Sequence, residues 1–320
     1  MPTRRSFLMG TLAVLPAMPA IAQSFNARQV QIYVPFAAGG AVDIVARKLA
    51  EQLAIRWGRQ PIIVNRPGAG GTIATQAMLQ NPADGYSFIV VANGHPLNQF
   101  FYEKLPYDTF KDFTPVVHVG QSPLAIIVSK SNPTPGLREY LDAMRPDPKG
   151  LSYGLSGIGT SAHLAGALLA QTAKINLVPV PYRSGAQAVT GVLAGDIPMS
   201  INPLAEVVGQ IEGGTVRVLA VTTAARAPSL PNVPTVAEAG YPGFNTAVWW
   251  GVVAPAGLPA DVLAALNRDL NAALQEKTVR DSFATLGAAP TGSTPQAFEA
   301  FLHAEADKWG PIIKSLAIKL

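Results

Sequence analysis

The sequence predicts an α/β protein made of two lobes. Its 320 residues exceed the usual size of one domain. From Val30 onward, short apolar runs alternate with helix-length amphipathic stretches, and glycine or proline stands at the junctions. With 48% hydrophobic and only 14% charged residues, the chain can bury a large core. We therefore expect two largely parallel sheets flanked by helices.

The first 22 residues have the pattern of an export signal. Arg4-Arg5 precedes an apolar stretch at 7–18, and residues 20–22 form a small-x-small cleavage site. Residues 3–8 also resemble a twin-arginine signal. A retained membrane anchor fits less well, because a span needs about 20 apolar residues. We expect a soluble mature protein that begins at Gln23 in the periplasm.

The first lobe is expected to comprise residues 23–124 and 246–320. Periodicity predicts that its elements are strand 30–34, helix 43–56, strand 61–65, helix 71–79, strand 87–92, strand 247–254 and helices 260–276 and 295–316. Trp249 and Trp250 are neighbours in one strand and point to opposite faces of the sheet. Core packing is expected for either, although one of them can face a cleft or hinge.

The second lobe is expected to comprise residues 125–245. Strand 124–128 leads out of the first lobe. The elements predicted to follow are strand 151–154, helix 161–172, strand 177–181, helix 185–194 and strand 217–221. Because the chain crosses between the lobes twice, we expect a hinge with a cleft beside it.

A glycine-rich loop follows the first strand. Phe36, Ala37, Gly39 and Gly40 lie between strand 30–34 and the next helix. Free N–H groups and the helix dipole favour an anion at such a helix start, by about 0.3 to 2 kcal/mol. Asp43 either caps this helix or positions water and donors. Residues 65–71 repeat the pattern and either brace the first loop, line the same cleft or form an ordinary turn.

The second lobe has a comparable loop at residues 157–163. It fits the loose dinucleotide pattern G-x-G-x-x-G/A. That pattern requires an acidic residue about 20 positions later, where this chain has Tyr182-Arg183-Ser184. We therefore interpret Gly157, Thr160 and Ser161 as a second anion-facing helix start. His163 either reaches the cleft or packs within the lobe.

Several function classes are disfavoured by the composition. The net charge of +4 is spread along the chain without the basic cluster of a nucleic-acid-binding protein. Cysteine is absent, which excludes disulfides and zinc–thiolate sites. The four histidines are widely separated, so we expect no metal or other cofactor. Residues 154–158 lack the final glycine of a nucleophile elbow, and no other enzyme motif is present.

The chain resembles Bug-type receptors, the solute-binding components of tripartite tricarboxylate transporters. The matching motifs span the mature sequence and are Val34-Pro35-Phe36, Gly39-Gly40, Asp43, residues 65–71, Leu105-Pro106-Tyr107-Asp108, Gly157, Gly159, His163, Leu164, Val180-Pro181-Tyr182, residues 230–235 and residues 254–257.

The resemblance implies a type II periplasmic-binding-protein fold, with two α/β lobes joined by a hinge. It implies a monomer, not an enzyme, that holds a small carboxylate between the lobes through main-chain amides and bridging waters. Membrane transporter subunits would receive the ligand; the alternative is a sensor that presents it to a membrane signalling partner. The expected ligand-binding residues are Phe36, Ala37, Gly39, Gly40, Asp43, Gly157, Thr160, Ser161, His163 and Tyr182.

The chain departs from the family pattern at three places. Ala38 replaces a common proline, Ala41-Val42 replaces a more polar pair, and Arg183-Ser184 replaces Lys-Gly. The apolar pair at 41–42 leads to the hypothesis that the mouth of the site is apolar and favours an aromatic or aliphatic acid.

Overall fold

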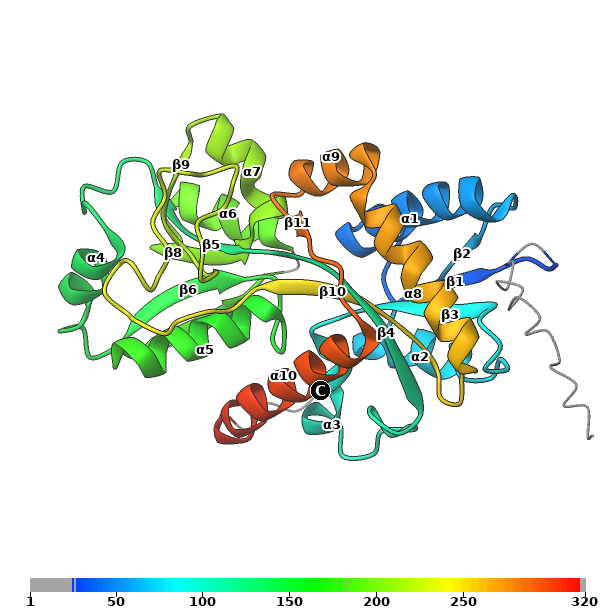
Figure 1. The fold of residues 1–320 in the computed structure, drawn as a ribbon. Helices are drawn as coiled ribbons and strands as arrows, with labels where there is room; N and C mark the ends of the chain where they lie inside the picture. Colours follow the sequence, from blue (N-terminus) through cyan, green and yellow to red (C-terminus); the bar gives the residue numbers. More distant parts are fainter. Residues whose placement is uncertain (1–24, 26, 183, 317–320) are drawn as a thin grey trace, which may run out of the picture.

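Two β-sheets, each covered by helices, form the two lobes of the computed structural model, which describes residues 25, 27–182 and 184–316 (Figure 1). The predicted export signal at residues 1–22 lies outside the described residues. This arrangement confirms the two-lobed α/β prediction.

The first lobe contains a six-stranded sheet of order β11-β4-β10-β3-β1-β2. Strand β1 is parallel to both of its neighbours, β2 and β3, whereas the pairs β3–β10, β10–β4 and β4–β11 are antiparallel. The strand bounds are β1 Gln31–Val34, β2 Ile62–Asn65, β3 Ser87–Ala92, β4 Phe113–Ser122, β10 Val248–Pro255 and β11 Ala289–Pro290.

The second lobe contains a five-stranded sheet of order β7-β6-β8-β5-β9. Strand β6 is parallel to β7 and β8, and β5 is antiparallel to β8 and β9. The bounds are β5 Leu124–Ser129, β6 Leu151–Leu155, β7 Leu177–Pro181, β8 Met199–Pro203 and β9 Val216–Val221. Most strands of each sheet run in one direction, as expected; the exceptions are β10 and β11 in the first sheet and β5 in the second.

Helices cover both faces of the first sheet. Helices α1 (Ala41–Trp57), α8 (Ala260–Gln275) and α9 (Lys277–Thr285) pack on one face. The other face carries α2 (Thr72–Met78), which follows the short helix η1 (Ala69–Gly71), and α10 (Pro295–Ser315) beside α3 (Gly94–Phe101). Both tryptophans of β10 are therefore buried: Trp250 packs on the first face and Trp249 on the second.

Helices also cover both faces of the second sheet. Helices α4 (Leu137–Met144) and α5 (Ser161–Ala173) pack on one face. Helices α6 (Gly185–Ala194) and α7 (Leu204–Glu212) pack on the other.

The two crossing segments are tied together by backbone and side-chain hydrogen bonds. Leu124 N donates to Thr222 Oγ1 at 2.9 Å, and Thr222 N donates to Leu124 O at 3.0 Å. Thr246 N donates to Thr222 O at 2.9 Å. Thr222, which follows β9 of the second lobe, thus joins the two crossing segments. The lobe limits of 124/125 and 245/246 stay predictions.

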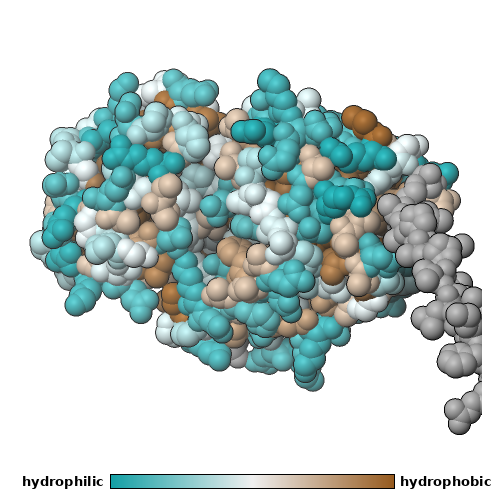
Figure 2. All heavy atoms as spheres, viewed as in Figure 1, coloured by the Kyte–Doolittle hydropathy of each residue, from teal (hydrophilic) through white to brown (hydrophobic). Residues whose placement is uncertain are grey.

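Exposed apolar side chains are scattered over the described surface. In Figure 2 the visible face is mostly hydrophilic, with small separate hydrophobic patches. No helix within residues 25, 27–182 and 184–316 has both the length and the apolar character needed to cross a bilayer.

Candidate ligand-binding site

The loop between β1 and α1 is held in shape by the first turn of α1. Gly40 occupies the N-cap position, and Gly39 has a φ of +85°, which favours glycine. The Gly39 N–H donates to Asp43 Oδ2 at 2.9 Å. Asp43 is therefore not the N-cap; it lies within the first turn and bonds back to the loop.

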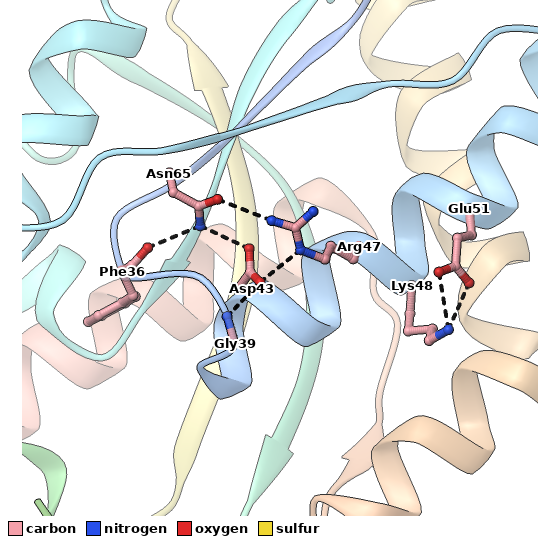
Figure 3. A network of polar contacts seen from close by, with 7 residues as sticks. All are labelled: Phe36, Gly39, Asp43, Arg47, Lys48, Glu51 and Asn65. Carbon is pink, nitrogen blue, oxygen red and sulfur yellow. Dashed lines mark hydrogen bonds and ion pairs between the residues drawn. The ribbon is translucent and has the colours of Figure 1, made fainter.

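Asp43 is the centre of a buried polar network (Figure 3). The side chain is only 1% exposed, and it accepts from Arg47 Nε at 2.8 Å and from Asn65 Nδ2 at 2.8 Å. The Asn65 amide also donates to Phe36 O at 3.1 Å. Burial alone would raise the pKa of Asp43, but the donors from Arg47, Gly39 and Asn65 lower it. An ionised Asp43 thus fixes the loop that carries Phe36.

The loop between β6 and α5 repeats this design in the second lobe. Thr160 is the N-cap: its Oγ1 accepts from His163 N at 3.4 Å and donates to Gly157 O at 2.8 Å. Gly159 N–H donates to His163 Nδ1 at 3.2 Å, the same i to i+4 contact that Gly39 makes with Asp43. Burial lowers the pKa of His163, so the imidazole stays neutral and can accept. His163 therefore packs within the lobe and braces the loop.

The other predicted site residues differ in their exposure and in their contacts. Phe36 is 40% exposed, and Ala37 is also exposed. Ser161 is half-buried at the first position of α5, and its hydroxyl has no hydrogen bond to the described residues. The Tyr182 hydroxyl lies against α6, since a Cβ on Gly191 would come within 2.5 Å of its oxygen.

The apolar surface near the loops does not come from residues 41–42. Val42 is only 7% exposed and belongs to the core of the first lobe, against which Ala41 also packs. These two residues therefore contribute little to the mouth, because the second position of α1 faces the sheet, and the expected preference for an aromatic or aliphatic acid stays a prediction. The exposed apolar side chains on the two loops are Phe36 and Ile158, each 40% exposed.

Sequence reasoning missed His95 at the start of α3. It follows β3, whose carboxyl end lies beside that of β1, and it lines a cavity of about 20 Å³ with Phe36, Gly70 and Asn98. His95 is 5% exposed, and neither ring nitrogen has a hydrogen-bond partner among the described residues. Burial lowers the pKa of His95 to about 3. The sequence contained one indication that His95 lies near the site, which was its position just after the third predicted strand of the first lobe.

Glu206 and Asn202 were also missed. They lie at the carboxyl end of β8, next to the end of β6 that carries the Gly157 loop. Glu206 Oε2 accepts from Gly185 N at 3.1 Å, at the start of α6. Burial raises the pKa of Glu206, outweighing this bond. The starts of α5, α6 and α7 therefore share one edge of the second sheet.

A larger hollow, of about 540 Å³, lies elsewhere on the first lobe. All its lining residues fall between Gln99 and Thr109, so the second lobe contributes nothing to it. We place the candidate site at the two glycine loops instead. Within the described residues no cluster of three or more His, Asp or Glu side chains is arranged to hold a metal ion.

Comparison with known proteins identifies the family. Residues 45–318 match the model of the tripartite tricarboxylate transporter family receptor. The chain belongs to this receptor family. The receptor is 34% identical to BugT of Bordetella pertussis over 308 residues, covering 95% of this chain and 94% of BugT.

Solved structures of related receptors have the same architecture. One is Rpa4515 of R. palustris with adipate: 35% identity, a TM-score of 0.80, and coverage of 92% of this chain and 99% of that one. Another is MatC of Rhodopseudomonas palustris with bound malate: 29% identity, a TM-score of 0.75, and coverage of 90% and 100%. The family match and these relatives confirm the predicted family and its solute-binding class.

Proposed function

We propose that this receptor captures a small carboxylate between its lobes in the periplasm and, as a monomer, delivers it to the membrane subunits of a tripartite transporter. The observation that carries the proposal is the pair of braced glycine loops, one at the start of α1 and one at the start of α5. Each brace fixes a helix N-terminus, where N–H groups and the dipole favour an anion. The adipate and malate complexes of its relatives support the same ligand class.

In the proposed mechanism one lobe binds the carboxylate first and closure brings the second loop onto it. Ser161 is suited to direct contact, because its hydroxyl lies at the first position of α5 and is free of other bonds within the described residues. Hydrogen bonds to a charged group contribute about 1.5 to 3 kcal/mol each, so a few bias the lobes toward closure.

The first test is thermal unfolding of residues 23–320 against mono-, di- and tricarboxylates, aromatic acids, amino acids, sugars and amines. A ligand at one hundred times its Kd should stabilise the native state by about 2.7 kcal/mol. We expect carboxylates to raise the melting temperature. Shifts with sugars or amines alone would contradict the proposal.

Ser161→Ala tests the second-lobe loop. Loss of one charge-assisted hydrogen bond should weaken carboxylate binding by about tenfold to one-hundredfold without changing stability. Ser282→Ala in α9 is the matched control, because that hydroxyl bonds only to Thr278 O at 2.8 Å. Equal affinities of wild type and Ser161→Ala would exclude Ser161 as a ligand contact.

Transport is separated from signalling by deleting the gene in its own bacterium. Loss of uptake of the radiolabelled ligand, with ligand-dependent transcription intact, supports transport. The opposite pattern supports the sensor alternative.

A further inference from the structure

Glu206 lies on the face of the second lobe that is turned toward the first. On one side of it, Leu204 at the start of α7 reaches the first lobe, because a Cβ on Gly287 would come within 2.7 Å of Leu204 Cδ2. On the other side, Leu164 of α5 packs in a cluster with Leu97 and Trp309 of the first lobe. Helices α6, α5 and α7 start at the carboxyl ends of the adjacent strands β7, β6 and β8, and Glu206 contacts the start of α6 at this end of the sheet.

The Glu206 carboxylate is accessible and has no cationic partner within residues 25, 27–182 and 184–316. Its side chain is exposed, so a group on a ligand can reach the carboxylate. Among the described residues no Lys, Arg or His forms an ion pair with it. Its one hydrogen bond is from Gly185 N.

A second acceptor beside Glu206 also lacks a donor. Asn202 is fully buried; its Nδ2 donates to Ser200 Oγ at 2.8 Å, and its Oδ1 has no partner among the described residues. Both acceptors crowd Gly185, since a Cβ there would lie 2.0 Å from Glu206 Oε2 and 2.9 Å from Asn202 Oδ1. Near the start of α6 the hydrogen-bond acceptors therefore outnumber the donors that the described residues supply.

Helix capping does not account for the charge. Ser184 already caps α6, accepting from Gln187 N at 3.3 Å. A neutral amide oxygen at position 206 would accept from Gly185 N equally well. A carboxylate next to an anion site instead repels a second negative group on the ligand and attracts a positive one.

We propose that Glu206 recognises an ammonium group on the ligand, so that the receptor selects an amino acid over the same carboxylic acid without the amine. This inference rests on the proposed function, because the carboxylate of that amino acid would bind at the glycine loops. Glu206 would then supply specificity, and the amides of the loops would supply the contacts common to all carboxylates.

The test is calorimetric titration of residues 23–320 with matched pairs: succinate and aspartate, glutarate and glutamate, and propanoate and alanine. Malate is added to separate an amine from a hydroxyl group. Wild type, Glu206→Gln and Glu212→Gln are compared. Glu212→Gln removes the same charge from the far end of α7, and melting curves establish that each variant is folded.

We expect wild type to bind the amino member of at least one pair tenfold or more tightly than its partner. Glu206→Gln should abolish that preference, chiefly by weakening the amino acid, and Glu212→Gln should retain it. The inference is overturned if amine-free acids or malate bind wild type as tightly as the amino acids, or if Glu206→Gln weakens both members equally. Failure of every carboxylate to bind would instead overturn the proposed function.

Discussion

Asp43 and His163 occupy equivalent positions in the two lobes and make the same contact. Each lies in the first turn of its helix and accepts the N–H of the glycine four residues earlier. Asp43 accepts more bonds than His163, since Arg47 and Asn65 also donate to it. Loop geometry in the first lobe should therefore depend strongly on one charge.

Asp43→Asn tests this dependence. The amide group keeps only one acceptor oxygen, so it cannot accept both the bonds that Gly39 and Arg47 make to Oδ2 and the bond that Asn65 Nδ2 makes to Oδ1; the variant should therefore lose about 1.5 to 3 kcal/mol of unfolding free energy. Carboxylate affinity should fall as well, because the loop carrying Phe36 is released. The measurement is urea unfolding followed by titration.

Asp281→Asn is the control for that experiment. Asp281 pairs with Lys277 at 2.6 Å in the same i,i+4 spacing, but both side chains are largely exposed. Removing this pair should change stability by less than about 0.5 kcal/mol. Equal losses in the two variants would contradict a special role for Asp43.

The sequence was informative about which loops matter and uninformative about side-chain direction. Both glycine loops were predicted from their place between a strand and a helix. The choice between capping and bracing for Asp43 depends on backbone torsions at Gly39 and Gly40, which residue types do not specify. The role of Glu206 could not be predicted from the sequence. Its hydrogen bond from Gly185 N forms only in the folded sheet, where β7 and β8 lie on either side of β6.

At the scale of elements, apolar or amphipathic segments bounded by glycine or proline were predictable even when short, whereas segments with an interrupted or polar pattern, such as β4, were missed. Strand β7 and helix α6 match the predicted bounds. Helix α3 was missed because it has eight residues and contains Pro96, and β8 because the buried Ser200 and Asn202 break its apolar pattern. Helix α9 was missed because most of its residues are polar or charged and it follows α8 almost directly.

Two helix glycines give opposite predictions for substitution by alanine. In α5, a Cβ on Gly166 would lie 2.3 Å from the ring and hydroxyl of the buried Tyr153. Gly166→Ala should therefore destabilise the protein by about 1 to 3 kcal/mol through overpacking. In α7, a Cβ on Gly209 meets nothing within 4 Å. Gly209→Ala should stabilise by roughly 0.5 to 1 kcal/mol, because alanine favours the helix.

Melting temperatures of the two variants, measured side by side, check this pair. The close approach of α5 to β6 would be contradicted if Gly166→Ala melted at or above the wild-type temperature. A lower melting temperature for Gly209→Ala would contradict the open surroundings of that glycine.

At the scale of the whole molecule, the lobes are joined by more than the crossing strands. Leu97 and Phe101 of α3 and Trp309 of α10 pack with Leu164 of α5, so an apolar cluster bridges the lobes beside the site. Trp309 Nε1 donates to Glu305 Oε2 at 3.2 Å, and Trp249 of the returning strand donates to the same oxygen. Opening of the lobes must therefore move or separate this cluster.

Acid should destabilise the whole fold through its buried neutral histidines. Burial lowers the pKa of His95 to about 3 and of His118 to about 4, and it lowers the pKa of His163. The unfolded chain protonates each of them near pH 6.5. As pH falls below 6.5 the unfolded state binds more protons, so the unfolding free energy should decrease, by up to about 1.4 kcal/mol per pH unit for each histidine. Glu206 opposes this trend, since its raised pKa favours the folded state as it protonates.

His118→Phe isolates one contribution to that slope. The ring of His118 stacks on Phe301 at 4.5 Å and on Phe298 at 5.8 Å, so phenylalanine keeps the packing while it removes the titrating group and its bond to the Gly120 backbone. Urea unfolding of wild type and variant between pH 6.5 and pH 4 should show a shallower decline in the variant, by up to about 1.4 kcal/mol per pH unit in the middle of this range. Parallel pH profiles for the two proteins would mean that His118 gains no extra proton on unfolding, and that its ring is not held neutral by the surrounding aromatic cluster.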